Sequence, residues 1–264
     1  MQWLHQIEAW RPLWEPRLVV FLLILSRVGA LIMTAPVLGA REAPMRVRAF
    51  LAVALSAVVA PLVWDSQVER PVHLAQMLAL IAGELVIGAT LGLGVMIVFS
   101  GIQVAGQLLG QVSGMALGEV FNPGLNEEVH SISQLLFYAT MAAFVLVGGH
   151  RQVVAALLDT LVAMPPGSGV AIEGSLESMT TLLSQSFLLG IRAAAPALTA
   201  LLLSTIVLGL IARTLPQLNA LALGIPLNTI VALAALAFSV GTVVMVFEDQ
   251  LDAVLETITD SWRG

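Results

Sequence analysis

Long apolar runs, separated by short polar segments, dominate the pattern of this chain. No segment alternates between apolar and polar residues with period two, and lipid tolerates only helices or closed barrels. A helix needs about 20 apolar residues to cross a hydrocarbon core of about 30 Å. By that measure six runs are candidate spans, the fourth short and the third and sixth long: Leu18–Pro36, Val47–Trp64, Leu74–Gln103, Leu135–Val147, Phe187–Ile211 and Leu218–Phe247. We therefore predict an all-α, polytopic membrane protein of roughly six hydrophobic helices, some of them broken or paired as hairpins.

Composition supports the membrane assignment and excludes several classes of function. Of the 264 residues, 58% are hydrophobic and 11% are charged, whereas soluble domains average about 45–50% and about 25%. The formal charge of -6 offers no basic surface for nucleic acid. There is no cysteine, and the four histidines are scattered without metal-ligand spacing. We predict no metal site, no cofactor and no enzymatic activity.

The stretch "QVAGQLLGQVSGMALGEVFNPG" places glycine at every fourth position, at Gly106, Gly110, Gly114 and Gly118. A helix advances about 100° per residue, so such a ridge drifts by about 40° at each repeat and cannot follow one straight neighbour for long. We predict helix through about Gly110, followed by a flexible loop of small residues that ends at Asn122-Pro123-Gly124. The alternative is a packing ridge within a continuous helix.

Four charged residues lie within or at the ends of apolar runs: Arg27, Glu84, Arg192 and Arg213. A charge at mid-bilayer costs about 2.5–3.5 kcal/mol, so such residues usually face a partner or a water-filled path. For Arg27 the alternatives are a functional role and either snorkelling or a structural ion pair. For Glu84 they are a hydrogen-bonded packing role and a proton relay. Nearby, Gly88 and Gly92 form a G-x-x-x-G contact face.

The segment "ARTLPQLNALALGIPLN" interrupts the last third of the chain. Pro216 and Pro226 remove backbone donors and disfavour helix at the residue before each. Gln217 and Asn219 carry side chains that can bond to freed carbonyls. The segment is either a break inside the membrane, covered by protein or water, or a hairpin turn at the surface with Arg213 at a helix C-terminus. Both interpretations predict a helix–break–helix unit.

Two further segments organise the C-terminal half. The loop Met164–Ser178 is rich in Pro, Gly and Ser and is long enough to separate two parts of the molecule. In the tail, Leu251, Val254, Leu255 and Ile258 have the spacing of one helical face among acidic residues. We predict an acidic amphipathic helix at the surface.

Several of these motifs resemble those of one family. "AAAPALTALLLSTIVLGLIARTLPQLNALALGIPLN" is similar to the Ala-Ala-Pro … Arg-x-x-Pro-Gln-x-Asn … Gly-x-Pro signature of the FliR family, the flagellar export-gate proteins and their injectisome counterparts. "SRVGALIMTAPVLGAREAPMRVRAFLAVALS" resembles the family's first hairpin and "GELVIGATLGLG" its glycine-rich helix. The stretch "QVAGQLLGQVSGMALGEVFNPG" resembles the family's central loop, and "GGHRQVVAALLDT" resembles its Gly-His motif. The chain departs from the family with Asn228, where Lys is frequent, and with Asn122-Pro123, where Asp-Pro is frequent.

The resemblance implies a partner set and a place in the cell. One copy would join FliP and FliQ in a helical assembly in the bacterial inner membrane, at the flagellar basal body, with FlhB and FlhA associated. The assembly would be the pore for unfolded flagellar subunits, and no nucleic acid would take part. Residues 1–165 would be a FliP-like helical half and residues 166–264 a FliQ-like helical hairpin.

The resemblance also implies roles for individual residues. The family's central loop closes the pore, and here it would span about residues 110–123, with these members: Gly110, Gln111, Gly114, Met115, Leu117, Gly118, Glu119, Val120, Phe121, Asn122 and Pro123. A second set would be intramembrane polar or assembly residues: Arg27, Glu84, Arg192, Arg213, Pro216, Gln217, Asn219, Gly224 and Pro226.

Other functions remain as alternatives. An injectisome homologue would carry the same motifs, and the "LGIP" form of the C-terminal motif favours flagellar membership. A small secondary transporter would also contain broken helices and intramembrane charges, but transporters usually show paired interruptions in two related halves. A structural scaffold subunit outside the export path is the third alternative, and the polar, glycine-rich central stretch argues for a gate instead.

Overall fold

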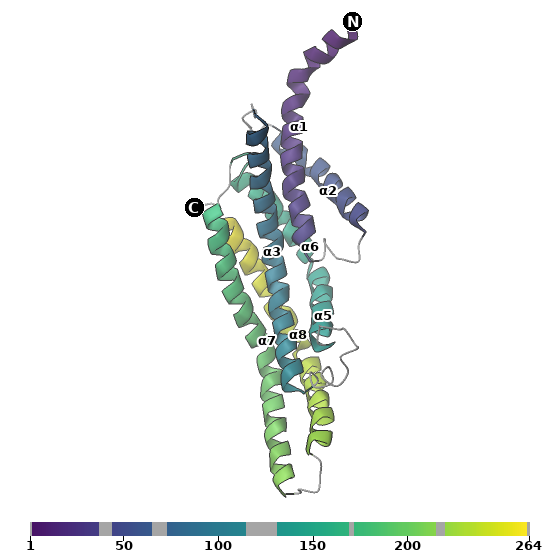
Figure 1. Cartoon of the computed structure of the whole chain (residues 1–264), viewed down its shortest axis with the longest axis vertical. Coiled ribbons are helices and arrows are strands. Elements are labelled where there is room, and N and C mark those ends of the chain that lie inside the picture. Colours follow the sequence, from purple (N-terminus) through teal and green to yellow (C-terminus); the bar gives the residue numbers. More distant parts are fainter. Residues whose placement is uncertain are drawn as a thin grey trace. The chain divides into compact units, whose positions relative to one another are not determined.

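The computed structural model describes residues 2–36, 44–64, 73–114, 131–168, 172–214 and 220–262. Every element in these ranges is helical (Figure 1): α1 (Gln2–Thr34), α2 (Met45–Val59), the 3-10 helix η1 (Ala60–Val63), α3 (Leu74–Val112), α5 (Ser131–Val147), α6 (Gly149–Ala163), α7 (Ile172–Thr214) and α8 (Ala220–Ser261). The predicted all-α fold class is confirmed.

Four helical segments of the described chain are long and apolar enough to cross a membrane: Pro16–Thr34, Met45–Val63, Leu74–Val112 and Ser175–Thr214. The bent pair Ile132–Val147 and Gly149–Ala163 passes the same test together and would make a fifth span. The sixth predicted run lies in α8, where the described apolar stretch is the shorter Pro226–Phe238. A polytopic membrane protein is therefore confirmed, with four or five candidate spans where the hydrophobic pattern predicted roughly six.

The chain forms two compact units, each built from several segments. The first unit consists of Met1–Met96, His150–Thr181 and Asp252–Gly264, and the second of Ile97–Gly149 and Leu182–Leu251. The predicted likeness of residues 1–165 to one partner subunit and of residues 166–264 to another is a separate question and stays a prediction.

In the first unit, α1 packs closely against α3 because α3 presents glycines there. A Cβ atom on Gly88 would collide with the backbone carbonyl oxygen of Arg27, and one on Gly92 would collide with the side chain of Thr34. The predicted G-x-x-x-G contact face is therefore confirmed. Small residues at both positions let the two backbones approach.

The end of α8 belongs to the same unit and buries its own apolar residues there. Val254, Leu255 and Ile258 are buried, while Asp252 and Glu256 are exposed. Trp262 donates from its indole N–H to the hydroxyl oxygen of Ser175, at 3.3 Å. The predicted acidic amphipathic helix is confirmed, and its apolar face packs within the protein.

In the second unit, aromatic rings and glycines form the core. The ring of Phe99 meets those of Phe137, Phe144 and Phe247 edge to face, with centroids 5.8, 5.7 and 5.2 Å away. Aromatic pairs favour this geometry because the positive ring edge meets the negative face. A second set of close contacts runs through Gly101, where a Cβ atom would lie 2.6 Å from the carbonyl oxygen of Ser186.

Candidate functional site

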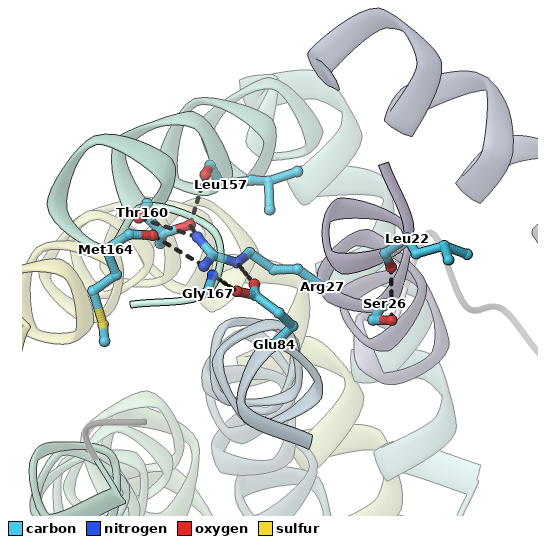
Figure 2. Close-up of polar contacts among 8 residues, drawn as sticks. All are labelled: Leu22, Ser26, Arg27, Glu84, Leu157, Thr160, Met164 and Gly167. Atoms are coloured by element: carbon cyan, nitrogen blue, oxygen red, sulfur yellow. Dashed lines mark hydrogen bonds and ion pairs between the residues drawn. The ribbon is translucent and has the colours of Figure 1, made fainter. Parts of the chain in front are cut away.

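The main polar site that the structure describes is a buried ion pair in the first unit. Arg27 of α1 is fully buried and Glu84 of α3 is 3% exposed. The Nε atom of Arg27 donates to Oε2 of Glu84 at 2.6 Å. Figure 2 shows the two side chains pointing toward one another, with Thr160, Met164 and Gly167 beside them. Two charges this deeply buried are tolerated only when each is paired and its remaining polar atoms are also bonded.

The other donors of Arg27 bond to the C-terminal end of α6. Nη1 donates to the carbonyl oxygen of Thr160 at 3.1 Å and to its hydroxyl oxygen at 3.2 Å. Nη2 donates to the carbonyl oxygen of Met164 at 3.0 Å. The last carbonyls of a helix carry the negative end of its dipole. The carbonyl oxygen of Thr160 also accepts the N–H of Met164 at 2.8 Å, so the guanidinium group adds a second donor there and complements the charge of the helix end.

The second oxygen of Glu84 holds the turn that follows α6. Its Oε1 atom accepts the backbone N–H of Gly167 at 2.9 Å. Gly167 has φ 83°, and the N–H of Ser168 donates to the carbonyl oxygen of Pro165 at 3.0 Å. These are features of a type II turn, which needs a left-handed residue at its third position and favours proline before it. The sequence Pro165-Pro166-Gly167-Ser168 suits that turn.

One carboxylate thus links α1, α3 and the segment that leads into α7. The structural ion pair, one of the alternatives for Arg27, is confirmed, as is the hydrogen-bonded role for Glu84. The contacts with Thr160, Met164 and Gly167 were not expected from the sequence. The only available signal was the turn motif "PPGS", which does not reveal which acidic residue bonds to it.

Of the glycines repeated at every fourth position, Gly106 lies in close packing and Gly114 lies where helix α3 ends. A Cβ atom on Gly106 would lie 2.5 Å from the Cα atom of Ser133 on α5, so this glycine permits close contact. Helix α3 stops at Val112. The N–H of Ser113 donates to the carbonyl oxygen of Leu109 at 2.9 Å. Gly114 has φ 79°, the left-handed conformation that commonly terminates helices at glycine.

The predicted end of helix near Gly110 is therefore confirmed to within two residues, and a continuous helix through Gly118 is wrong. In the candidate loop, Gly110 is buried, Gln111 is exposed and Gly114 is half-buried. The remaining members lie outside the described residues: Met115, Leu117, Gly118, Glu119, Val120, Phe121, Asn122 and Pro123.

The predicted helix–break–helix motif is confirmed, and it lies in the second compact unit. Helix α7 ends at Thr214 with Arg213 in its last turn, and α8 begins at Ala220. Pro216, Gln217 and Asn219 lie outside the described residues. Pro226 lies inside α8, so the expectation that it disfavours helix at the preceding residue is wrong. Pro226 is the seventh residue of α8, past the first turn, so it removes one hydrogen bond from within the helix.

The remaining candidates occupy different environments on this hairpin. Gly224 is half-buried, with its Cα facing the side chain of Leu208, since an added Cβ atom would lie 3.7 Å from Leu208 Cδ1. Arg192 and Arg213 are both exposed on α7. Neither forms a hydrogen bond or ion pair with the residues that the structure describes.

A polar cluster that the sequence did not predict joins α7 to α8. The hydroxyl of Ser204 donates to Oδ1 of Asn228 at 2.7 Å. The Nδ2 atom of Asn228 lies 3.4 Å from the hydroxyl oxygen of Thr205. The adjacent Ser-Thr pair inside an apolar run was the available signal.

Comparison with known proteins shows which family this chain matches. The profile of the family described as "Bacterial export proteins, family 1" matches residues 18–254. The chain is 29% identical over 224 residues to the flagellar biosynthetic protein FliR of Escherichia coli, which covers 85% of each chain. It is 24% identical over 237 residues to FliR of Caulobacter vibrioides, which covers 90% of this chain and 94% of the relative. The secretion system apparatus protein SsaT of Salmonella typhimurium is 27% identical over 163 residues, 61% of this chain and 63% of the relative.

Proposed function

Because this chain belongs to the bacterial export proteins, family 1, we propose that it is a subunit of the flagellar export gate in the inner membrane, at the flagellar basal body. Family membership makes it a protein-export component of the flagellar and type III kind rather than an enzyme. The observation that carries the proposal is that the family match runs through nearly all of the helices, residues 18–254.

The flagellar assignment is favoured over the injectisome by how much of the chain each relative matches. The FliR proteins of Caulobacter and Escherichia cover 90% and 85% of this chain, whereas SsaT covers 61%. We infer that the cargo is unfolded flagellar subunits. The partners are FliP and FliQ in the pore itself, with FlhB and FlhA beside it.

The gate itself is the loop of about residues 110–123. Its support is the way α3 ends. Gly106 holds the helix against α5, and Gly114 turns the chain out of the helix in the left-handed conformation. The loop that follows carries Met115, Leu117, Val120 and Phe121, which are apolar side chains suited to sealing a narrow pore. In this proposal the pore is closed by a loop whose first residues are held in place by the end of α3.

Co-purification with FliP and FliQ from the same cell tests the assembly. A stable complex that contains all three proteins is expected. Recovery of this chain alone, from membranes where FliP and FliQ form their own complex, would contradict the assignment.

A shortened loop tests the gate. Deleting part of residues 115–121 should leave the complex intact and allow ions to leak through cells that are not exporting. The matched control is the Gly209→Ala variant, which changes an open site on α7 and should stay sealed. A shortened variant that assembles and remains fully sealed would exclude the loop as the closure.

A further inference from the structure

The first unit is built from stretches that are far apart in the sequence. Two of them, Met1–Met96 and His150–Thr181, are followed by residues 182–251 of the second unit, and only then comes the third, Asp252–Gly264. At about 5–20 residues per second, synthesis of the intervening part takes about 4–14 s, whereas helices form within about a microsecond. The first unit therefore stays open during synthesis until its third stretch arrives.

The end of α8, Asp252–Trp262, is this third stretch, and we call it the α8 latch. Its inner face is apolar and buried, with Val254, Leu255 and Ile258 exposed by 1%, 6% and 0%. Its outer face carries acidic residues such as Glu256, which is exposed. A helix divided in this way covers a core on one side and meets polar surroundings on the other. The latch is therefore an outer layer of the first unit.

Side-chain hydrogen bonds hold the latch at both of its ends. At its start, Nε2 of Gln152 donates to Oδ1 of Asp252 at 2.7 Å. At its end, the indole N–H of Trp262 donates to the hydroxyl oxygen of Ser175 at 3.3 Å. Gln152 lies in the first turn of α6 and Ser175 in the first turn of α7. The closed latch therefore braces the beginnings of two helices.

The first turns of α7 carry polar groups that are buried when the latch is closed. Ser175 is 5% exposed and Ser178 is 3% exposed. A buried hydroxyl without a partner lowers stability, and the bond from Trp262 gives Ser175 a donor. While the latch is open, Ser175 lacks this donor and the inner face of the latch has nothing to pack against. Apolar surface that is exposed in this way during folding makes wrong contacts.

We propose that the α8 latch is an assembly checkpoint: the chain joins its partner subunits only after residues 252–262 have closed on α6 and α7. The proposal rests on the function proposed above, because it concerns entry into the export gate. Helix α7 leads from its braced first turn into the hairpin with α8, so an open latch leaves the beginning of that helix unsupported. A closed latch also marks a chain that has been synthesised at least as far as Trp262.

A single cysteine at Thr259 reports whether the latch is closed, since the chain has no native cysteine. Thr259 is 8% exposed. Its hydroxyl donates to carbonyls of its own helix, those of Leu255 and Glu256, each at 3.0 Å. Thr259→Cys therefore keeps the bonds that hold the two ends of the latch. A buried thiol is protected from a water-soluble maleimide, so the labelled fraction measures the open latch.

Pulse-labelling of cells that contain tagged FliP tests the order of events. Protection of the thiol at position 259 should precede recovery of the chain with FliP, and recovered chains should carry a protected thiol at all times. Recovery of chains with reactive thiols, in the same proportion as in the unassembled pool, would overturn the proposal. So would thiols that become protected only in chains bound to FliP, because the partner would then be closing the latch.

A polar substitution on the inner face opens the latch. Ile258→Asn places an amide where the native side chain is fully buried, so the open fraction should rise by a factor of about 5–30. Recovery with FliP and FliQ should fall in proportion. Glu256→Asn introduces the same residue on the exposed face and should change neither quantity. An Ile258→Asn chain that is recovered normally with a reactive thiol would refute the checkpoint, and a thiol that stays protected would refute the latch.

Trp262→Phe separates opening of the latch from a general loss of folding. The substitution keeps an aromatic ring and removes the N–H that bonds to Ser175. In a companion variant without the reporter cysteine, a disulfide between cysteines at Leu208 and Gly224 shows that the hairpin of α7 and α8 still forms. With the hairpin intact, the open fraction and the loss of recovery should both lie between those of the unmodified chain and Ile258→Asn.

Failure of the checkpoint can be distinguished from failure of the proposed function. Normal recovery of Trp262→Phe despite an increased open fraction would contradict the checkpoint alone. An unmodified chain whose reporter thiol is protected but which never enters a complex with FliP and FliQ would contradict the proposed function, because closure of the latch is measured without the partners.

Discussion

Helices α3 and α7 are similar in length and in apolar character, yet they are buried very differently. The candidate span on α3 is 61% buried within the protein and that on α7 is 17% buried. Glycine placement accounts for much of the difference. Gly88 admits α1, Gly101 admits α7 and Gly106 admits α5, each at backbone-contact distance. Gly209 of α7 has no atom within 4 Å of the position where a Cβ would lie. Among the described glycines of α7, only Gly190 makes a comparable approach, against the backbone oxygen of Gly101, so the placement of small residues as well as apolar character affects how much of a helix is buried.

The largest effect should come from the buried charge of α1 that pairs with Glu84 of α3. Arg27→Met leaves the buried carboxylate of Glu84 without its cation and removes the guanidinium donors from the carbonyls of Thr160 and Met164. Removing one member of a buried ion pair costs about 3–5 kcal/mol. We expect a large loss of thermal stability in detergent, measured by the temperature at which the purified protein aggregates.

The matched control is the same substitution on α7. Arg192→Met changes an exposed arginine with no partner among the described residues, so its stability in detergent should change by about 0.5 kcal/mol or less. Equal losses in both variants would refute the assignment of Arg27 as the deeply buried member. Glu84→Gln should also destabilise the protein, because Gly167 keeps an acceptor while Arg27 loses its counter-ion.

A pair of glycine substitutions tests the comparison directly, and the two effects should have opposite signs. Gly88→Ala places a methyl group against the backbone oxygen of Arg27 and 3.1 Å from the Cβ atom of Ala30. A backbone cannot move aside cheaply, so the cost should be about 1–3 kcal/mol. Gly209→Ala meets open space and gains helix propensity, worth about 0.4–1 kcal/mol.

Thermal aggregation of the two purified variants in detergent measures both effects. Gly88→Ala should aggregate at a lower temperature than the unmodified protein, and Gly209→Ala at an equal or higher one. If Gly88→Ala is neutral, α1 does not approach α3 as closely as the structure places it.

The contrast between α3 and α7 also shows how much of the fold and of the candidate site could be predicted from the sequence. The spans, the amphipathic tail and the close contacts of Gly88 and Gly92 were predictable, because hydrophobic period and G-x-x-x-G spacing are local signals. Arg27 and Glu84 could be singled out as charges in apolar runs. Their third partner, the turn at Gly167, could not be found, because a backbone N–H carries no sequence signature and lies 83 positions from Glu84.

A smaller effect is expected where α3 ends. Gly114 adopts φ 79°, which costs a residue with a Cβ about 1–2 kcal/mol. Gly114→Ala should therefore favour an α3 that continues beyond Val112 and a shorter loop after it. The measurement is flagellar export by cells that carry the variant, with Gly114→Asn as the control because asparagine tolerates the left-handed conformation. Equal export by both variants would show that the helix stop does not matter for the gate.

The smallest effect should come from the polar contact that joins α7 to α8. Hydrogen bonds between membrane helices average about 0.6 kcal/mol, so Asn228→Leu should barely change stability. It should instead loosen the register of the hairpin, because Asn228 bonds to both Ser204 and Thr205 of α7. A cysteine pair at Leu208 and Gly224, whose native contact lies beside this cluster, reports the register through its rate of disulfide formation. Introducing Asn228→Leu should slow that rate, whereas Thr199→Ala, which removes only a bond within α7, should leave it unchanged. An unchanged rate in both variants would mean that apolar packing alone sets the register, and that α7 needs no polar contact with Asn228 to hold α8 in place.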